Sequence, residues 1–349
     1  MKITAQHLMS LMNEWAPPSL AEKWDHPGLQ VGNSQVPVQK VLISLDLTEE
    51  NVDLAIREGV SMIISHHPFL FKGLHELDLT TYKGRVIEKL IKHDILAFAA
   101  HTNLDTAKGG VNDALAAALD LKELRGLVPE KTHPMYKLAA YVTPTAAKAF
   151  YHHVKETYGN DVGHYYLLDD EDDMIQEAKM EMNVLAPSLS ALLADLQTYC
   201  GKVHYDIYPL ANGEEKEYMG RVGYLPKEMS GIEALQYIKE KLGIPDLRYA
   251  GDVERRVKTV AILGGAGSEF AALAKSKGAD LYLTGDLKYH EAQDASRLGL
   301  LIADGGHFYT ERVIVPALAK RIRDAAKERA WDLEVLEDSQ AEDIFGHLQ

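Results

Sequence analysis

Two histidines stand side by side at the end of a short apolar run, Met62-Ile63-Ile64-Ser65-His66-His67-Pro68. An apolar, β-rich run that stops at a proline predicts a buried strand, and open α/β sheets bind ligands at the ends of their strands. Adjacent histidines alone are more often solvated or structural than bound to metal. The pair therefore indicates a metal site only if further ligands converge on it.

Two other strand ends supply such ligands. The apolar run at residues 300–303 leads to His307, and Glu311 follows four residues later, one turn on if the chain is helical there. The apolar run at residues 95–100 leads in the same way to His101 and Asp105. Residues four apart on a helix share one face, so His307 and Glu311 can point at the same place.

These strand ends together carry the donors that a dinuclear metal centre needs. Such a centre combines imidazole nitrogen with carboxylate oxygen, and one oxygen ligand bridges two cations about 3.5 to 4 Å apart. Each residue taken alone is more simply explained as an exposed or capping side chain. Five of them at strand ends favour a metal centre instead: His66, His67, Asp105, His307 and Glu311.

The elements that would position these residues alternate between strand and helix in two separate parts of the chain. Predicted strands lie at residues 41–46, 62–65 and 95–100, and again at 259–263, 281–284 and 300–303. This alternation predicts βαβ units and a largely parallel sheet. The second part resembles a degenerate copy of the first, because each ends in a histidine and a carboxylate four residues apart. We expect two similar α/β lobes that form a three-layer core, with the site between them.

The segment between the lobes has a different pattern. Its predicted elements follow the order strand, helix, strand, strand, helix, strand, which is that of a ferredoxin-like α+β domain. We expect the first lobe at residues 1–129, the inserted domain at 130–215 and the second lobe at 216–349. The acidic run at residues 169–173 falls on the predicted hairpin between the middle strands of the insert, where a solvated loop is a simpler explanation than a cation site.

Composition limits the possible partners. The 349 residues carry a formal net charge of −15, which argues against broad binding to nucleic acid or to anionic membranes. Cys200 is the single cysteine, so any metal must be held by His, Asp and Glu. The N-terminus lacks the order of a signal peptide, and no run approaches the roughly 18 apolar residues of a membrane helix. We expect a soluble protein of the reducing cytoplasm.

Three weaker features are best explained structurally. The glycine-rich run at residues 264–267 could present N–H groups to a phosphate, but it matches no complete nucleotide-binding motif and a tight turn is the simpler interpretation. The segment at residues 24–32 reads as a turn-rich connection. Asp286 follows a predicted strand, and helix capping is its simplest role.

Six motifs follow one another along the chain: Trp24-Asp25-His26-Pro27-Gly28-Leu29-Gln30-Val31-Gly32, Ser65-His66-His67-Pro68, His101-Thr102-Asn103-Leu104-Asp105, Gly264-Gly265-Ala266-Gly267, Thr284-Gly285-Asp286 and Gly306-His307-Phe308-Tyr309-Thr310-Glu311. In this order they resemble the Nif-three-like dinuclear-metal proteins, also named the GTP cyclohydrolase I type 2 family. The insert, which includes Tyr205-Asp206-Ile207-Tyr208-Pro209-Leu210, is similar to the P-II or CutA-like domain of longer bacterial members.

The resemblance implies two divalent metal ions per chain. Zinc is the expected metal, and iron, manganese or cobalt would suit the same ligands. Glu311 becomes the expected bridge, and His101 lies near the metals as a general acid or base or as a residue that orients Asp105. The five implied ligands are His66, His67, Asp105, His307 and Glu311.

The resemblance also implies a toroidal homohexamer whose metal sites face an internal cavity. The implied activity is metal-assisted hydrolysis, with GTP or a related nucleotide as the small-molecule substrate. Two alternatives stay open. A metal-dependent phosphoesterase would use the same ligands, and a non-enzymatic hexameric scaffold or sensor could keep a metal site without turnover.

Overall fold

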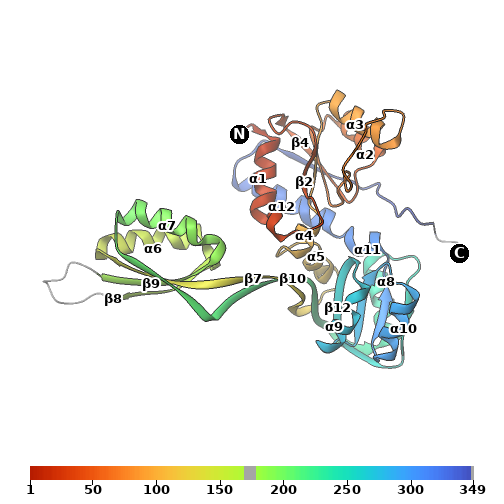
Figure 1. The fold of residues 1–349 in the computed structure, drawn as a ribbon. Coiled ribbons are helices and arrows are strands. Elements are labelled where there is room, and N and C mark those ends of the chain that lie inside the picture. Colours follow the sequence, from red (N-terminus) through yellow and green to blue (C-terminus); the bar gives the residue numbers. More distant parts are fainter. Residues whose placement is uncertain (169–177, 347–349) are drawn as a thin grey trace. The chain divides into compact units, whose positions relative to one another are not determined.

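The computed structural model describes residues 1–168 and 178–346, which form two compact units (Figure 1). The first unit comprises Met1–Glu130 and the chain from Tyr218 onward, and the second comprises Lys131–Glu217. The acidic run at residues 169–173 lies outside the described residues. The order of elements in the insert predicts that the second unit can fold alone, and this stays a prediction.

A five-stranded sheet builds the first lobe of unit 1, with the strand order β15-β4-β5-β6-β2. Its strands are β2 (Gly28–Val31), β4 (Lys40–Ser44), β5 (Met62–Ser65), β6 (Leu96–Ala99) and β15 (Glu334–Glu337). Four strands run parallel, and β2 is antiparallel to β6. Two short strands, β1 (Ile3–Thr4) and β3 (Pro37–Val38), pair separately from this sheet.

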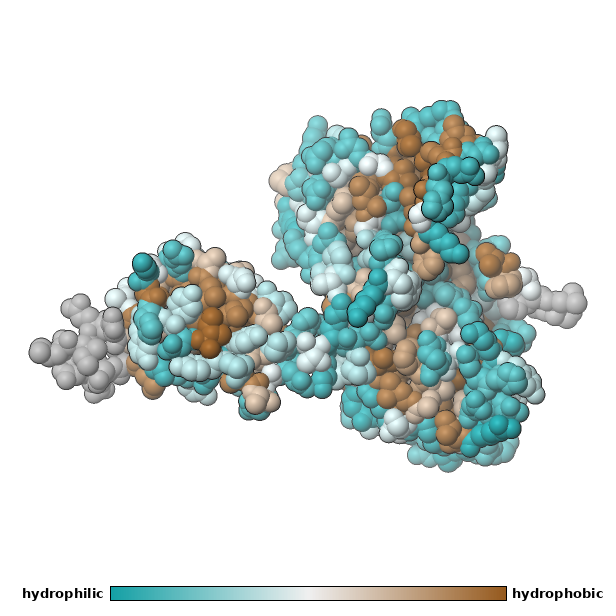
Figure 2. All heavy atoms as spheres, in the orientation of Figure 1, coloured by the Kyte–Doolittle hydropathy of each residue, from teal (hydrophilic) through white to brown (hydrophobic). Residues whose placement is uncertain are grey.

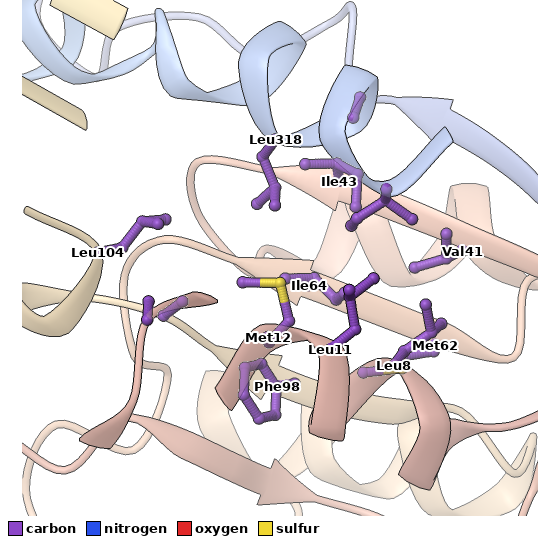
Figure 3. Close-up of a cluster of buried hydrophobic side chains, with 14 of the residues drawn as sticks. Leu8, Leu11, Met12, Val41, Ile43, Met62, Ile64, Phe98, Leu104 and Leu318 are labelled. Atoms are coloured by element: carbon purple, nitrogen blue, oxygen red, sulfur yellow. The ribbon is translucent and has the colours of Figure 1, made fainter. Parts of the chain in front are cut away.

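Helices bury both faces of this sheet. On one face α1 (Ala5–Trp15) and α12 (Ile314–Glu328) pack together, and Figure 3 shows Leu8, Met12 and Leu318 among the side chains of the strands. On the other face lie α2 (Glu49–Glu58) and α3 (Tyr82–Lys92). Burying each Leu or Met side chain contributes about 1.5 to 3 kcal/mol, so the layers hold the strand ends in fixed positions.

The second lobe repeats this arrangement. Its parallel strands are β12 (Arg256–Ala266), β13 (Leu281–Gly285) and β14 (Leu301–Asp304), with β11 (Arg248–Ala250) antiparallel to β14. The end of β10 (Tyr205–Ser230) is antiparallel to β12. One face carries α5 (Val111–Ala118) and α8 (Gly231–Leu242), and the other carries α9 (Ala271–Ser276) and α10 (Tyr289–Arg297). The predicted α/β class with two similar lobes and three layers is confirmed.

A five-residue helix follows the third strand of each βαβαβ set. In the first lobe this helix is α4 (Thr102–Thr106), which comes directly after β6 and His101. In the second lobe it is α11 (His307–Glu311), which comes after β14 and a glycine pair. The two helices are thus equivalent in topology, and each carries one of the predicted carboxylate ligands.

The second unit follows the predicted order of strands and helices. It contains the end of β7 (Lys122–Val142) and the start of β10, with α6 (Pro144–Thr157), β8 (Val162–Leu168), β9 (Ala178–Leu185) and α7 (Ala186–Cys200) between them. The strand β9 is antiparallel to both β7 and β8. Its core joins the strands to both helices through side chains such as Phe150, Met182 and Leu192.

Three sequence interpretations were wrong in detail. Within the insert the sequence predicts strands at residues 136–142 and 203–208. The observed strands β7 and β10 are much longer, because the prolines and glycines inside them interrupt the alternating pattern without ending the strands. The connection at residues 24–32 contains β2, whose turn signals come from Gly28 and Gly32, with φ of +120° and +113°. The sequence also predicts a helix capped by Ser268, but Ser268 instead starts a short 3-10 turn, Ser268–Phe270.

Hydrophilic residues cover most of the face drawn in Figure 2, and hydrophobic residues lie there in separate patches. This surface agrees with a chain in which 26% of the residues are charged. Among the described residues, no helix combines the length and apolar character needed to cross a bilayer.

Candidate metal centre

The six residues singled out in the sequence lie together where strands of the two lobes end. His66 and His67 follow β5, His101 and Asp105 follow β6, and His307 and Glu311 form the ends of α11. Their donor atoms form three groups, each with all distances within 4.8 Å. The groups are His66 with His67 and His101; His67 with His307 and Glu311; and His66 with Asp105 and Glu311.

Glu311 belongs to two of these groups through different oxygens. Its Oε2 lies 2.8 Å from His67 Nε2 and 3.1 Å from His307 Nε2. Its Oε1 instead faces His66, with 3.8 Å between Oε1 and Nε2. A carboxylate that turns one oxygen to each of two donor groups has the arrangement that bridging two cations requires.

His67 and His307 form an outer group with Glu311. Their side chains are 23% and 38% exposed, and each ring turns Nδ1 towards a second carboxylate. His67 Nδ1 lies 2.7 Å from Asp46 Oδ1, and His307 Nδ1 lies 2.8 Å from Asp286 Oδ2. Such carboxylate partners orient metal-binding imidazoles, because they fix the ring and leave Nε2 facing the site.

The same carboxylates control the charge of the outer histidines. Burial alone would lower the pKa of His67, but its contacts with Asp46 and Glu311 raise the pKa to about 10. Burial likewise disfavours the charged form of His307, whereas Glu311 and Asp286 raise its pKa to about 9. Without metal, both rings are therefore cationic at neutral pH.

An inner group consists of His66, Asp105 and Glu311. The His66 side chain is fully buried, and its Nδ1 lies 2.8 Å from the carbonyl oxygen of Ala100, which directs Nε2 towards Asp105. The distance from His66 Nε2 to Asp105 Oδ1 is 3.5 Å. Both atoms are buried and lack a hydrogen-bond partner within the described part of the chain. Buried polar atoms are normally satisfied, so this pair of donors fits a cation held between them.

The pKa values of the two carboxylates in the cluster shift in opposite directions. Burial raises the pKa of Asp105 to about 7, although the nearby His66 opposes this shift. Burial would also raise the pKa of Glu311, but the surrounding histidines, led by His307, hold it well below its usual value. Glu311 is therefore ionised and is the fixed negative charge at the centre of the cluster.

The glycine-rich run packs its backbone against Glu311. A Cβ on Gly265, which has φ of +68°, would lie 2.2 Å from Glu311 Oε1. The N–H of Gly265 donates to Thr310 Oγ1, and the N–H of Gly264 donates to Asn112 Oδ1, both at 3.0 Å. Side-chain oxygens thus accept the hydrogen bonds of these two N–H groups. The glycine-rich run therefore serves close packing at the site rather than phosphate binding.

His101 is held by a residue that the sequence did not single out. Its Nδ1 lies 3.1 Å from Oδ2 of Asp25, which also accepts hydrogen bonds from the N–H and hydroxyl of Thr102. Burial would raise the pKa of Asp25, but His101 and Thr102 lower it to about 2. The segment before β2 thus places a carboxylate beside His101, whose ring centroid is 5.3 Å from that of His66.

The sequence analysis also misjudged the role of Asp286 and missed that of Asp46. Asp286 was expected to cap a helix, yet it contacts His307. Asp46 drew no prediction, although it follows β4 just as the predicted ligands follow their strands. Position at a strand end was the one signal that could have found both.

A cavity of about 1330 Å³, here called the acidic cavity, reaches the outer group. His67 and His307 line it together with two basic side chains, Lys83 and Arg248. Eight carboxylates also line it, and they attract cations towards the histidines. These are Asp46, Glu50, Asp246, Asp286, Asp304, Asp338, Glu342 and Asp343.

Comparison with known proteins gives a family match over nearly the whole chain. A family model described as Duf34/NIF3 (NGG1p interacting factor 3) matches residues 3–343. A Halalkalibacterium halodurans protein named GTP cyclohydrolase 1 type 2 homolog is 34% identical over 374 residues, covering 99% of each chain. A Bacillus subtilis protein of the same name is 34% identical, covering 95% of each chain.

Solved structures agree with this match. A Bacillus cereus protein described as related to NIF3 is 34% identical with a TM-score of 0.90, and the match covers 99% of each chain. A Staphylococcus aureus protein is 30% identical with a TM-score of 0.81, again over 99% of each chain. The fold is therefore similar to these structures from end to end.

Proposed function

Because the chain belongs to the Duf34/NIF3 family, we propose that it is a hydrolase that depends on a dinuclear metal centre. The proposal rests above all on Glu311, whose two oxygens face different histidines. The outer cation would be held by His67, His307 and Oε2 of Glu311, and the inner cation by His66, Asp105 and Oε1. Imidazole and carboxylate donors suit zinc, and also iron, manganese or cobalt.

The chemistry expected of the bound cations is to lower the pKa of a water molecule and to polarise the attacked group of the substrate. The protein residues have separate tasks. Asp46 and Asp286 orient the outer histidines, and Ala100 orients His66. His101 would carry a proton between water and the leaving group, with Asp25 fixing its ring. In the alternative role, His101 would only orient Asp105.

The substrate proposed is GTP or a related nucleotide. Relatives that are 34% identical are named GTP cyclohydrolase 1 type 2 homolog, and this name supports a guanine nucleotide as the first substrate to test. The reaction would add water to the imidazole carbon between the two ring nitrogens and open that ring. Assembly into a toroidal homohexamer is also part of the proposal, and the mass of the native particle, measured by light scattering, tests it.

The experiment compares wild-type protein with His101→Gln, both loaded with zinc and assayed with GTP by chromatography of the products. Gln keeps a similar shape but cannot act as an acid or base at neutral pH. We expect His101→Gln to retain the wild-type metal content and to lose about 100-fold or more in turnover. A wild-type protein that holds its metal but consumes neither GTP nor another nucleotide would favour a scaffold or sensor instead.

A further inference from the structure

Two large aromatic side chains are exposed next to His101. Trp24 is 54% exposed and Phe71 is 51% exposed, although both belong to segments that approach the metal-ligand cluster. The ring centroid of His101 is 5.9 Å from that of Trp24 and 6.3 Å from that of Phe71. The His101 centroid is in turn 5.8 Å from that of His67. Only the ring of His101 thus separates Trp24 and Phe71 from the metal-ligand cluster.

The geometry of the pair limits how a planar ligand could contact it. The centroids of Trp24 and Phe71 are 5.7 Å apart, with 59° between the ring planes. A planar ligand inserted between two rings needs about 7 Å, twice the usual stacking distance, so no ring fits between them. A ligand ring can instead stack on the open face of the indole while Phe71 contacts its edge.

We propose that Trp24 and Phe71 form a stacking platform for the planar heteroaromatic ring of the substrate. The platform would hold the ring beside His101, so that a carbon of the ring faces the cluster of metal ligands. This inference rests on the proposed function and specifies its substrate class. It requires a ring such as a purine, and it excludes a phosphoester whose only recognised feature is the phosphate.

The charges around the acidic cavity and around the platform support this placement. The acidic cavity has eight carboxylates in its lining, which repel a nucleoside triphosphate. Trp24, Phe71 and His101 lie outside that lining. The platform also has exposed basic neighbours in the chain, Lys23 beside Trp24 and Lys72 beside Phe71. An anionic ligand with an aromatic ring therefore fits the platform better than the acidic cavity.

The test measures binding rather than turnover, by calorimetry on zinc-loaded protein. The probes are GTP and inorganic triphosphate, which lacks the ring. We expect Trp24→Ala to weaken GTP binding about tenfold, since stacking on an aromatic side chain has this effect on a base, and to leave triphosphate binding unchanged. Trp24→Phe should restore most of the affinity, because it restores a ring.

Tyr289→Ala is the matched control, because Tyr289 is 76% exposed on α10. It should leave the binding of both probes unchanged. Equal losses for GTP and triphosphate in Trp24→Ala would overturn the proposal, as would wild-type protein that binds GTP no more tightly than triphosphate. A variant that changes the native mass but not the GTP affinity would also overturn it and would make the pair a contact between copies.

The outcomes separate this inference from the proposed hydrolase. If the protein binds GTP through Trp24 and Phe71 but never hydrolyses it, the result supports the stacking platform and contradicts the proposed hydrolase. If the protein hydrolyses GTP, and the Trp24→Ala and Phe71→Ala variants bind GTP with unchanged affinity, the result supports the proposed hydrolase and contradicts the stacking platform.

Discussion

His67 Nε2 lies 2.8 Å from Glu311 Oε2, although 244 positions separate the two residues in the chain. His67 belongs to the first lobe and Glu311 to the second, so this contact joins the lobes at the site. Without metal the contact is an ion pair, because the pKa of His67 is raised to about 10 while Glu311 stays ionised. A cation that binds Nε2 must displace the proton from this contact.

Metal binding to the outer group should therefore release protons. At pH 7 His67 and His307 are protonated, since their pKa values are raised to about 10 and about 9. Metal affinity should rise with pH until both pKa values are passed. Calorimetric titration in two buffers of different ionisation enthalpy measures the protons released at pH 7, and Asp46→Asn should lower that number. Binding heat that is independent of the buffer would contradict this prediction.

Gly265→Ala should remove metal from the cluster. The new Cβ would lie 2.2 Å from Glu311 Oε1, so Glu311 must move away from its present position. Gly278→Ala is a matched control, because Gly278 also has positive φ, at +85°, but has nothing within 4 Å of the added Cβ. Both variants should lose about 1 kcal/mol or more of stability from backbone strain. Only Gly265→Ala should lose metal, as measured by plasma mass spectrometry, and full metal content in this variant would contradict the packing argument.

Much of the site could be predicted because it follows strand ends. An apolar run that stops at a histidine can be recognised from the sequence alone. All six residues found in this way lie together in the structure. The partners Asp25 and Asp46 were not predicted as partners, because their roles depend on contacts between distant segments. Asp25, for example, is 77 positions from Thr102, to which it is hydrogen-bonded. The lengths of β7 and β10 were missed because local proline and glycine signals outweighed pairing between strands.

Asp25→Asn should make the protein less stable, in a way that depends on pH. The Asp25 side chain is only 1% exposed, and its pKa is lowered from 3.8 to about 2. A lowered carboxyl pKa stabilises the fold above the unfolded value and loses this effect as pH falls towards the folded value. The ionised group thus contributes about 2 kcal/mol at pH 6, and roughly half of that at pH 3.

Urea unfolding of wild type and Asp25→Asn at pH 6 and pH 3 measures this effect. The difference between the two proteins in the free energy of unfolding should be smaller at pH 3. Asp294→Asn serves as the control, since the Asp294 side chain is 73% exposed, and it should change little at either pH. A difference for Asp25→Asn that is the same at both pH values would show that its carboxyl does not titrate as described.

The number of metal ions per chain tests the dinuclear centre most directly. Plasma mass spectrometry on protein purified without added metal, and again after reconstitution with zinc, should give two ions for the wild type. His66→Ala should lose the inner ion, His67→Ala the outer ion and Glu311→Ala both, while Tyr289→Ala keeps two. A wild type that holds no metal after reconstitution, or a Glu311→Ala variant that still holds two ions, would contradict the account of Glu311 as the bridge.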